Sequence, residues 1–272
     1  MRTQAGAEAR GERAHPDGHG GMRAGAEGWL IALHDTAERG WDDEDCRAVL
    51  SPEEARRADR FRRPTSAVAY VRVRSAVRRV LAHVLGESPA EVRIAVAPGG
   101  GPVLPEHPDW YVSWSASKDA LLVGVCRGAP IGVDVEVIRP VESPAQVLRT
   151  FYPSAFALGE FHEPETFFSA WTLLEAAVKA TGRGLARGAR EVQLYRPPGA
   201  RRCALAGVRD GAGVPWSGRT ERFALPRSSD EVMTAVVTRG AAVPVRLHTW
   251  RLPDAPPSGD APRPVSGTGV AP

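Results

Sequence analysis

The sequence predicts an α+β protein made of two similar halves that meet near residue 130. Segments with strand-like and helix-like apolar spacing follow one another in the order strand, helices, strands, once before residue 130 and once after it. The chain has 272 residues, of which 43% are hydrophobic and 25% charged, as is typical of a globular protein with a substantial core. We expect the N-terminal half over residues 28–130 and the C-terminal half over 131–252.

The two ends of the chain differ from the rest in composition. Residues 1–27 contain almost no large apolar side chain, and residues 253–272 are rich in proline, glycine, serine and alanine. Such segments cannot bury enough apolar surface to offset the entropy lost on ordering, so we expect both to be disordered tails.

The N-terminal half should open with a strand at Trp29–His34. Ser51-Pro52-Glu53-Glu54 is a capping box with proline at the first helical position, which predicts a helix that begins there and is broken by Pro64. A second helix is expected from about Ser66 to Leu85, with Gly86 as its stop. The remaining elements expected here are a strand at Val92–Val96, a loop over 97–109, and a hairpin of Trp110–Ser115 and Leu121–Cys126.

The C-terminal half should begin with a strand at Ile131–Val137 and contain a helix at Phe167–Thr181 that ends at Gly182. Four later strands, mostly antiparallel, are expected at Val192–Tyr195, Phe223–Leu225, Val232–Thr238 and Val245–Thr249.

Two carboxylates interrupt the apolar strand at 131–137. Asp134 and Glu136 are two residues apart, so both side chains point to one face while Val133 and Val135 point to the other. Adjacent carboxylates repel each other unless a cation lies between them. A solvent-facing strand with ordinary alternation would give the same pattern, so this spacing alone leaves both interpretations open.

The helix at 167–181 adds a third carboxylate and an ammonium, because Glu175 and Lys179 are one turn apart on the same face. In isolation this spacing could equally be a surface ion pair worth a few tenths of a kcal/mol. Together with Asp134 and Glu136, however, these groups could hold a hard divalent cation and a phosphate, which phosphoryl transfer requires.

These residues carry a family resemblance. Gly-Val-Asp-Val-Glu at 132–136, followed by Trp-Thr-x-x-Glu-Ala-x-x-Lys-x-x-Gly-x-Gly-Leu at 171–185, resembles the two signature motifs of the Sfp-type 4′-phosphopantetheinyl transferases. The basic segment at 51–61, Gly-Gly-Pro at 100–102 and the strand at 110–115 resemble further family segments in the same order. The resemblance extends from about residue 28 to residue 250.

The resemblance implies a fold of two pseudo-symmetric α+β halves with the site between them. It implies a reaction in which coenzyme A donates its 4′-phosphopantetheine arm to a serine of an apo acyl or peptidyl carrier protein and 3′,5′-ADP is released. The implied Mg²⁺ ligands are Asp134, Glu136 and Glu175, and the implied catalytic residues are Glu175 and Lys179.

The resemblance also implies coenzyme A contacts for Arg57, Ser113, Ser115 and Lys179. Several other positive or polar anchors of the family are replaced in this chain, at Ala69, Gly101, Trp114 and Leu174. Two further functions therefore stay open beside the transferase. One is a repurposed family member that keeps the metal site but has altered coenzyme or substrate use, and the other is a non-enzymatic carrier-protein binder.

The overall charge fits anionic partners. The net charge of +3 suits coenzyme A and the acidic helices of carrier proteins, and we find no nucleic-acid recognition motif and no apolar run long enough to cross a bilayer. We expect a cytoplasmic monomer that binds neither nucleic acid nor membrane. Cys46, Cys126 and Cys203 are isolated, with no Cys-x-x-Cys spacing, which argues against a disulfide framework or a zinc site.

Overall fold

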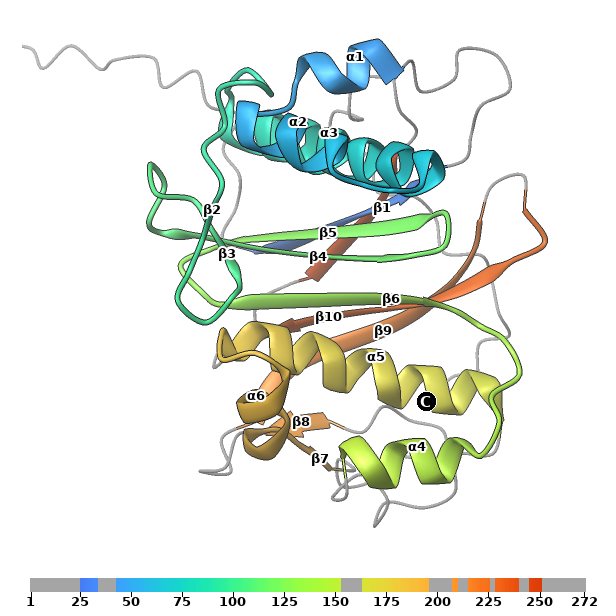
Figure 1. Cartoon of the computed structure of the whole chain (residues 1–272). Helices are drawn as coiled ribbons and strands as arrows, with labels where there is room; N and C mark the ends of the chain where they lie inside the picture. The colour runs from blue at the N-terminus through green and yellow to red at the C-terminus, as the bar shows by residue number, and fades with distance from the viewer. Residues whose placement is uncertain are drawn as a thin grey trace, which may run out of the picture.

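The computed structural model shows two stacked β-sheets, each with helices on its outer face, which confirms the predicted α+β class (Figure 1). The structure describes residues 25–33, 43–152, 163–195, 207–209, 215–225, 228–239 and 245–250. The tails expected at 1–27 and 253–272 lie outside these ranges, except for residues 25–27.

The first sheet has the strand order β11-β1-β5-β4, and the long helix α3 packs on its outer face (Figure 1). Alternation along β5 divides its side chains between two apolar layers. Leu121, Val123 and Val125 face α3, whereas Leu122 and Cys126 face the second sheet. The bounds are β1 Ala26–Ala32, β4 Trp110–Ser117, β5 Ala120–Arg127, β11 Val245–Trp250 and α3 Pro64–Leu85.

The predicted capping box is present at the start of α2 (Pro52–Asp59). The Ser51 hydroxyl accepts a hydrogen bond from the Glu54 amide at 3.2 Å, and the Ser51 amide donates to Glu54 Oε2 at 2.9 Å. Pro64 not only separates the two helices but also begins α3, two residues earlier than predicted. Proline suits this first position because the missing N–H has no helical partner there.

The second sheet has the order β6-β10-β9-β8-β7, and the helix α5 covers its outer face (Figure 1). Val133, Val135 and Val137 lie in the layer between the two sheets, as the sequence predicts, whereas Met233 and Ala235 of β10 face α5. The bounds are β6 Ile131–Val137, β7 Gln193–Tyr195, β8 Gly207–Arg209, β9 Pro215–Ala224, β10 Glu231–Thr238 and α5 Pro164–Thr181.

The last described strand returns to the first sheet. β11 pairs in parallel with β1, with Ala26 opposite Val245 and Ile31 opposite Trp250. Residues 245–250 fall in the range expected for the C-terminal half, yet they cover the edge of β1 that β5 leaves free.

Several short elements connect the layers and have no counterpart in the sequence-based expectations. They are the helices α1 Asp43–Ala48, α4 Pro144–Phe151 and α6 Leu185–Glu191, and the strand β3 Pro102–Val103. This strand pairs with β2 Ala95–Val96, which is shorter than the strand predicted at Val92–Val96. Helices α4 and α6 both lie beside α5, at the outer face of the second sheet (Figure 1). Within the described ranges, no helix is long and apolar enough to cross a membrane.

Serine side chains of β4 join the two sheets at one edge. The Ser113 hydroxyl accepts a hydrogen bond from the Val133 amide at 3.1 Å, and the Ser117 hydroxyl accepts one from the Val137 amide at 3.3 Å. Strand β4 therefore lies along β6, and serine side chains make these contacts because the two strands are edge strands of different sheets. This seam places the polar face of β4 beside the carboxylates of β6.

Candidate functional site

A close contact between β6 and α5 brings the four predicted acidic and basic residues together. Gly132 makes the contact possible, since a Cβ atom at this position would lie 1.8 Å from the Ala176 carbonyl oxygen and 2.6 Å from the Ala180 amide nitrogen. Glycine therefore lets the strand approach the helix backbone directly. Asp134 and Glu136 follow on β6, and Glu175 and Lys179 face them from α5.

Asp134 is the most buried charged group of this site, with 4% of its surface exposed. Its Oδ1 accepts hydrogen bonds from Lys179 Nζ and from the Ser115 hydroxyl, both at 2.7 Å, and Lys179 also donates to the Val133 carbonyl at 3.1 Å. Burial raises the pKa of Asp134 above its ordinary value, although Lys179 and Ser115 both favour the charged form. The surroundings therefore stabilise this carboxylate only in part.

Glu175 lies one helical turn before Lys179 and is partly buried. Its Oε1 accepts a hydrogen bond from the Tyr152 hydroxyl at 3.0 Å. Burial raises the pKa of Glu175, and the charge of Asp134 raises it further, while Tyr152 and Lys179 oppose the change. The pKa of Tyr152 is itself raised by burial and by Glu175, so this hydroxyl keeps its proton and acts as the donor.

Glu136 occupies a more open position on the same face of β6. The Ser117 hydroxyl donates to its Oε2 at 2.8 Å, and Arg139 donates to the same oxygen at 3.3 Å. Each carboxylate of the predicted set thus has at least one polar partner from outside that set, namely Ser115, Ser117 or Tyr152.

The donor set fits a hard cation in its chemistry. In the described part of the chain, no three His, Cys, Asp or Glu side chains gather closely enough to form a metal cluster. Two observations still favour a cation beside Asp134. Its Oδ2 is buried and has no hydrogen-bond partner among the described residues, and its charge helps to raise the pKa of Glu175. A divalent cation would relieve both the unpaired oxygen and the repulsion between these carboxylates.

Glu175 and Lys179 line a largely apolar cavity of about 880 Å³, together with Ser113, Trp114 and the loop of residues 99–105. This loop contacts the end of α5, because a Cβ atom at Gly99 would lie 1.9 Å from the Gly182 carbonyl oxygen. The cavity is large enough for a small-molecule ligand and has an ammonium and a carboxylate at one end.

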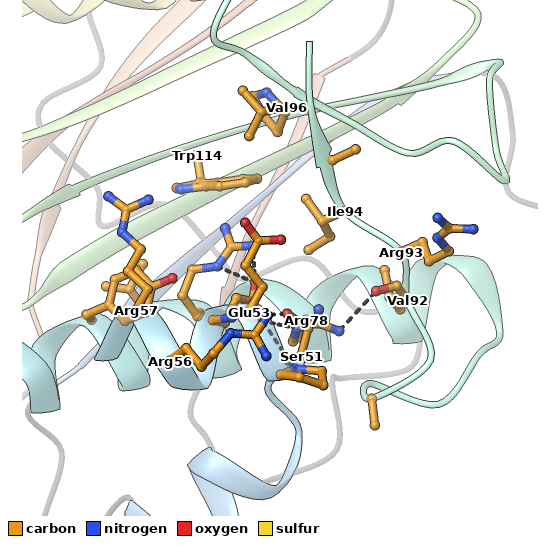
Figure 2. Close-up of a pocket in the computed structure, with 18 of the residues that line it drawn as sticks. Ser51, Glu53, Arg56, Arg57, Arg78, Val92, Arg93, Ile94, Val96 and Trp114 are labelled. Atoms are coloured by element: carbon orange, nitrogen blue, oxygen red, sulfur yellow. Dashed lines mark hydrogen bonds and ion pairs between the residues drawn. The ribbon is translucent and has the colours of Figure 1, made fainter. Parts of the chain in front are cut away.

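A second cavity, of about 1040 Å³, lies between α2 and the hairpin β2–β3. Figure 2 shows Ser51 and Arg56 on one side and Trp114 and Val96 on the other. Both cavities share Gly100, Pro102, Pro105 and Trp114 as lining residues, so they adjoin at the Trp114 ring. The basic residues lining this second cavity are Arg56, Arg57, Arg60, Arg74, Arg78 and Arg93.

Two of these arginines are held by a buried carboxylate. Glu54 accepts hydrogen bonds from Arg74 Nε at 2.7 Å and from Arg78 Nε at 2.6 Å, and the Arg74 guanidinium lies 4.7 Å from the centre of the Trp114 ring. Burial would raise the pKa of Glu54, but Arg74, Ser51 and Arg78 outweigh it and hold the pKa below its ordinary value. Arg57, the predicted coenzyme contact, lies over the Tyr70 ring at 5.4 Å.

The remaining predicted positions have different surroundings. Ser113 lines the smaller cavity, whereas Ser115 points its hydroxyl to Asp134. Leu174 is fully buried in the core beneath α5, and Ala69 is exposed on α3. Gly101 lines the smaller cavity with open space around it.

Sequence reasoning missed Tyr152, Ser117 and Arg139 as polar partners of the site. Ser117 shares its strand face with Ser113 and Ser115, so alternation could have found it. Tyr152 comes just after a short helix and has no periodic neighbour, so no sequence signal marks it.

Comparison with known proteins finds a family match over the segment that contains the four predicted residues. Residues 130–235, which include β6 and α5, match the family model of the 4′-phosphopantetheinyl transferase superfamily. The chain is homologous to the 4′-phosphopantetheinyl transferases. This confirms the resemblance that the motifs at 132–136 and 171–185 predict.

Curated 4′-phosphopantetheinyl transferases match about half of this chain, and the matched part spans less than two thirds of their own length. The chain is 30% identical to HetI of Nostoc sp. over 152 residues, 29% to psf-1 of Bacillus pumilus over 150, and 23% to Sfp of Bacillus subtilis over 147. Each alignment covers 53% of this chain, and it spans 64%, 63% and 65% of these phosphopantetheinyl transferases respectively.

Proposed function

We propose that this protein transfers the 4′-phosphopantetheine arm of coenzyme A to a serine of an apo acyl or peptidyl carrier protein, in a Mg²⁺-dependent reaction that releases 3′,5′-ADP. The observation that carries the proposal is the contact of Lys179 with buried Asp134, beside Glu175, in the segment that matches the family. The same residues suit phosphoryl transfer on chemical grounds alone.

The chain's own residues divide the chemistry between them. The Lys179 ammonium lines the smaller cavity, where it would bind pyrophosphate oxygens and stabilise negative charge on the leaving group. Glu175, whose raised pKa makes it a better base than an ordinary glutamate, would accept the serine proton directly or through a water. The serine oxygen then bonds to the phosphorus that carries the pantetheine, and the bond from that phosphorus to 3′,5′-ADP breaks.

Asp134, Glu136 and Glu175 would hold Mg²⁺. When bound, the ion supplies positive charge that offsets the charge of the pyrophosphate. Asp134 also orients Lys179 through its Oδ1, and Ser115 orients Asp134 through the same oxygen. The polar partners outside this set therefore fix the directions of the groups that would act on the pyrophosphate.

The two adjoining cavities fit the two ends of coenzyme A. The arginine-lined cavity suits the phosphorylated nucleotide end, with Arg56, Arg57 and Arg60 as phosphate donors. The more apolar cavity beside Lys179 suits the pantetheine arm. Trp114 lies where the two cavities adjoin, so a ligand that occupies both must pass its ring.

A mass-shift assay tests the proposal directly. Purified protein is incubated with coenzyme A, Mg²⁺ and a panel of apo carrier proteins, and intact-mass spectrometry follows the carriers. We expect a gain of one phosphopantetheine on at least one carrier. The Lys179→Met variant, which keeps a long side chain but removes the ammonium, should give no such gain. Omission of Mg²⁺ should also abolish the gain. No mass gain on any carrier would contradict the proposal.

A second candidate function is a repurposed enzyme that uses a different pyrophosphate donor. Two observations favour it. Arg74 is already engaged with Glu54 and Trp114, and position 174 holds a buried leucine, so neither position offers a free cation for a 3′-phosphate. Calorimetric titration of coenzyme A against 3′-dephospho-coenzyme A separates the two functions. Equal affinities would favour the repurposed enzyme, and a strong preference for coenzyme A would favour the transferase.

A further inference from the structure

We propose that Tyr152 is a positioning residue for Glu175, because its hydroxyl fixes one carboxylate oxygen and leaves the other directed to the cation and the substrate. The inference rests on the proposed function of the site. It assigns a role to a residue outside both signature motifs and on a different element from either of them.

Tyr152 makes its hydrogen bond to Glu175 from outside the two cavities described above. The Tyr152 side chain is buried, with 1% of its surface exposed, and its hydroxyl donates to Glu175 Oε1 at 3.0 Å. Glu175 lines the cavity beside Lys179, whereas Tyr152 does not line either of the two cavities described above. Tyr152 therefore acts on the reaction only through Glu175.

The ring of Tyr152 is held rigidly by aromatic neighbours. It meets the Trp171 ring edge-on, with centroids 5.8 Å apart and planes at 80°. Trp171 also stacks on Phe167 at 5.9 Å and meets Phe151 edge-on at 5.8 Å. Trp171 precedes Glu175 by one helical turn, so the packing lies on the same face of α5 as the carboxylate.

The main chain fixes Tyr152 from its other side. Its amide donates to the Leu148 carbonyl at 2.7 Å, which ends helix α4, and Leu148 is fully buried in the core beneath α5. The backbone of α4 and the side chains of α5 thus determine where the hydroxyl points. A group held at both ends loses little entropy when it makes a hydrogen bond, which is what a positioning role requires.

Glu175 needs such a restraint because of its charged surroundings. It is partly buried beside Asp134 and Glu136, whose charges disfavour a third carboxylate near them. Without a partner on Oε1, the side chain would turn away from these charges. The Tyr152 hydroxyl opposes that movement with a hydrogen bond to a charged acceptor, the stronger class of such bonds.

The test removes a single oxygen atom. Tyr152→Phe keeps every ring contact with Trp171 and loses only the hydroxyl. We expect the affinity for Mg²⁺, measured by calorimetry with coenzyme A present, to fall roughly 10- to 100-fold, the range found when partners of metal ligands are removed. The kcat for carrier modification should fall similarly, while the KM for coenzyme A changes less than about twofold because Tyr152 does not contact it.

Phe151→Leu is the matched control. Phe151 packs on the same Trp171 ring, is 47% exposed and makes no polar contact with Glu175. This variant loosens the aromatic packing alone, so its Mg²⁺ affinity and kcat should stay within about twofold of the wild type. Circular dichroism melting curves of both variants check that the fold is kept.

Two outcomes would overturn the inference while the wild type remains active. In the first, Tyr152→Phe leaves the Mg²⁺ affinity and kcat unchanged. In the second, Tyr152→Phe and Phe151→Leu lose equally, which would assign the effect to packing. A wild type that neither binds Mg²⁺ nor modifies any carrier would refute the proposed function, and the inference with it. The activity of the wild type therefore separates the two failures.

Discussion

The buried carboxylate of Asp134 is costly for the folded protein. It is 4% exposed, its Oδ2 has no hydrogen-bond partner among the described residues, and its pKa is raised by burial. A buried charge with incomplete pairing destabilises a protein unless a bound ion or ligand completes the pairing. Its contact with Lys179 and the nearby charge of Glu175 fit the binding of a cation and a phosphate that we propose for this site.

Asp134→Asn should reduce carrier modification by at least about 100-fold, because it removes the charge while preserving size and most polar contacts. The stability effect depends on pH. A carboxyl group whose pKa is raised on folding contributes stability below its unfolded pKa and loses it as the pH rises through the folded value. Relative to wild type, the variant should therefore become more stable as the pH rises from about 4 to about 7.

Urea unfolding at several pH values checks the trend, and the mass-shift assay checks the activity. Asp45→Asn, the same change at an exposed position of α1, serves as the control. A pH-independent stability difference between Asp134→Asn and wild type would refute the assigned origin of the effect.

The grouping of the four residues of the predicted site could be predicted because their periodicity is visible in the sequence. Alternation placed Asp134 and Glu136 on one face, and helical spacing placed Glu175 and Lys179 on another. Tyr152 could not be found this way, since its contact with Glu175 joins elements 23 residues apart with no shared period. The metal role of these residues stays a prediction.

At the scale of elements, the approach of β6 to α5 depends on one missing side chain. Gly132→Ala would place a methyl group 1.8 Å from the Ala176 carbonyl oxygen, so strand and helix must separate. We expect a loss of about 1–3 kcal/mol in the free energy of unfolding, the usual cost of overpacking. Carrier modification should fall by more than the loss of folded protein explains, because Asp134 moves away from Lys179.

The matched control is Gly101→Ala, because an added methyl carbon at this position has no heavy atom within 4 Å of it. Its free energy of unfolding should change by less than about 0.5 kcal/mol. Chemical denaturation of both variants makes the comparison, and the carrier assay is read for Gly132→Ala against wild type because Gly101 lines the smaller cavity. Equal effects of the two substitutions would contradict the steric argument.

The pairing of α2 with α3 depends on Glu54, which binds both Arg74 and Arg78. Glu54→Gln leaves Arg78, whose side chain is 3% exposed, without its charged partner. We expect a loss of about 3 kcal/mol at pH 7, as for other broken buried pairs. Because folding lowers the pKa of Glu54, its stabilisation is present above the unfolded pKa and is lost as the pH falls through the folded one.

The difference between wild type and Glu54→Gln should therefore shrink below about pH 4.5, the ordinary value for glutamate. Glu53→Gln, on the exposed side of the same helix turn, should change stability by no more than about 0.5 kcal/mol. Thermal melts from about pH 3 to about pH 7 provide the measurement, and a difference that stays constant over this range would count against the pairing.

Elements with strong local signals were easier to predict than the others, and the ten-residue strand β9 was predicted only near its end, at Phe223–Leu225. The capping box, the helix ending at Gly86 and the hairpin of β4 and β5 all follow from local signals. Helices α1, α4 and α6 have six to eight residues each, so they carry too few turns for a periodic pattern. The pairing of β11 with β1 is non-local, and strand propensity at 245–250 carries no information about its partner.

At the scale of the whole molecule, an apolar layer between the sheets joins the two parts of the chain. Leu122 and Ala26 contribute to it from the first sheet, and Val133, Val135 and Val236 from the second. The return of β11 to β1 adds a further link between residues beyond 238 and the start of the fold. The symmetry of the two halves stays a prediction, but their cores are not separate.

We therefore expect a single unfolding transition. Leu122→Ala, at a fully buried position in the shared layer, should destabilise the protein by about 2–5 kcal/mol and shift the tryptophan fluorescence and circular dichroism curves together. Trp29 lies in the core beneath α3 and Trp216 in the core beneath α5, so fluorescence reports on both. Two resolved transitions would show that the halves unfold independently.

The serines of β4 also determine how the two sheets are aligned lengthwise. Ser113, Ser115 and Ser117 occupy alternate positions and bond in order to Val133, Asp134 and the segment 136–137. A slip of β4 by one residue would turn all three hydroxyls to the opposite face and break every one of these bonds together. These hydrogen bonds therefore fix the register between the two edge strands in steps of two residues. The carboxylates of β6 are either all placed beside the serines of β4 or none of them is.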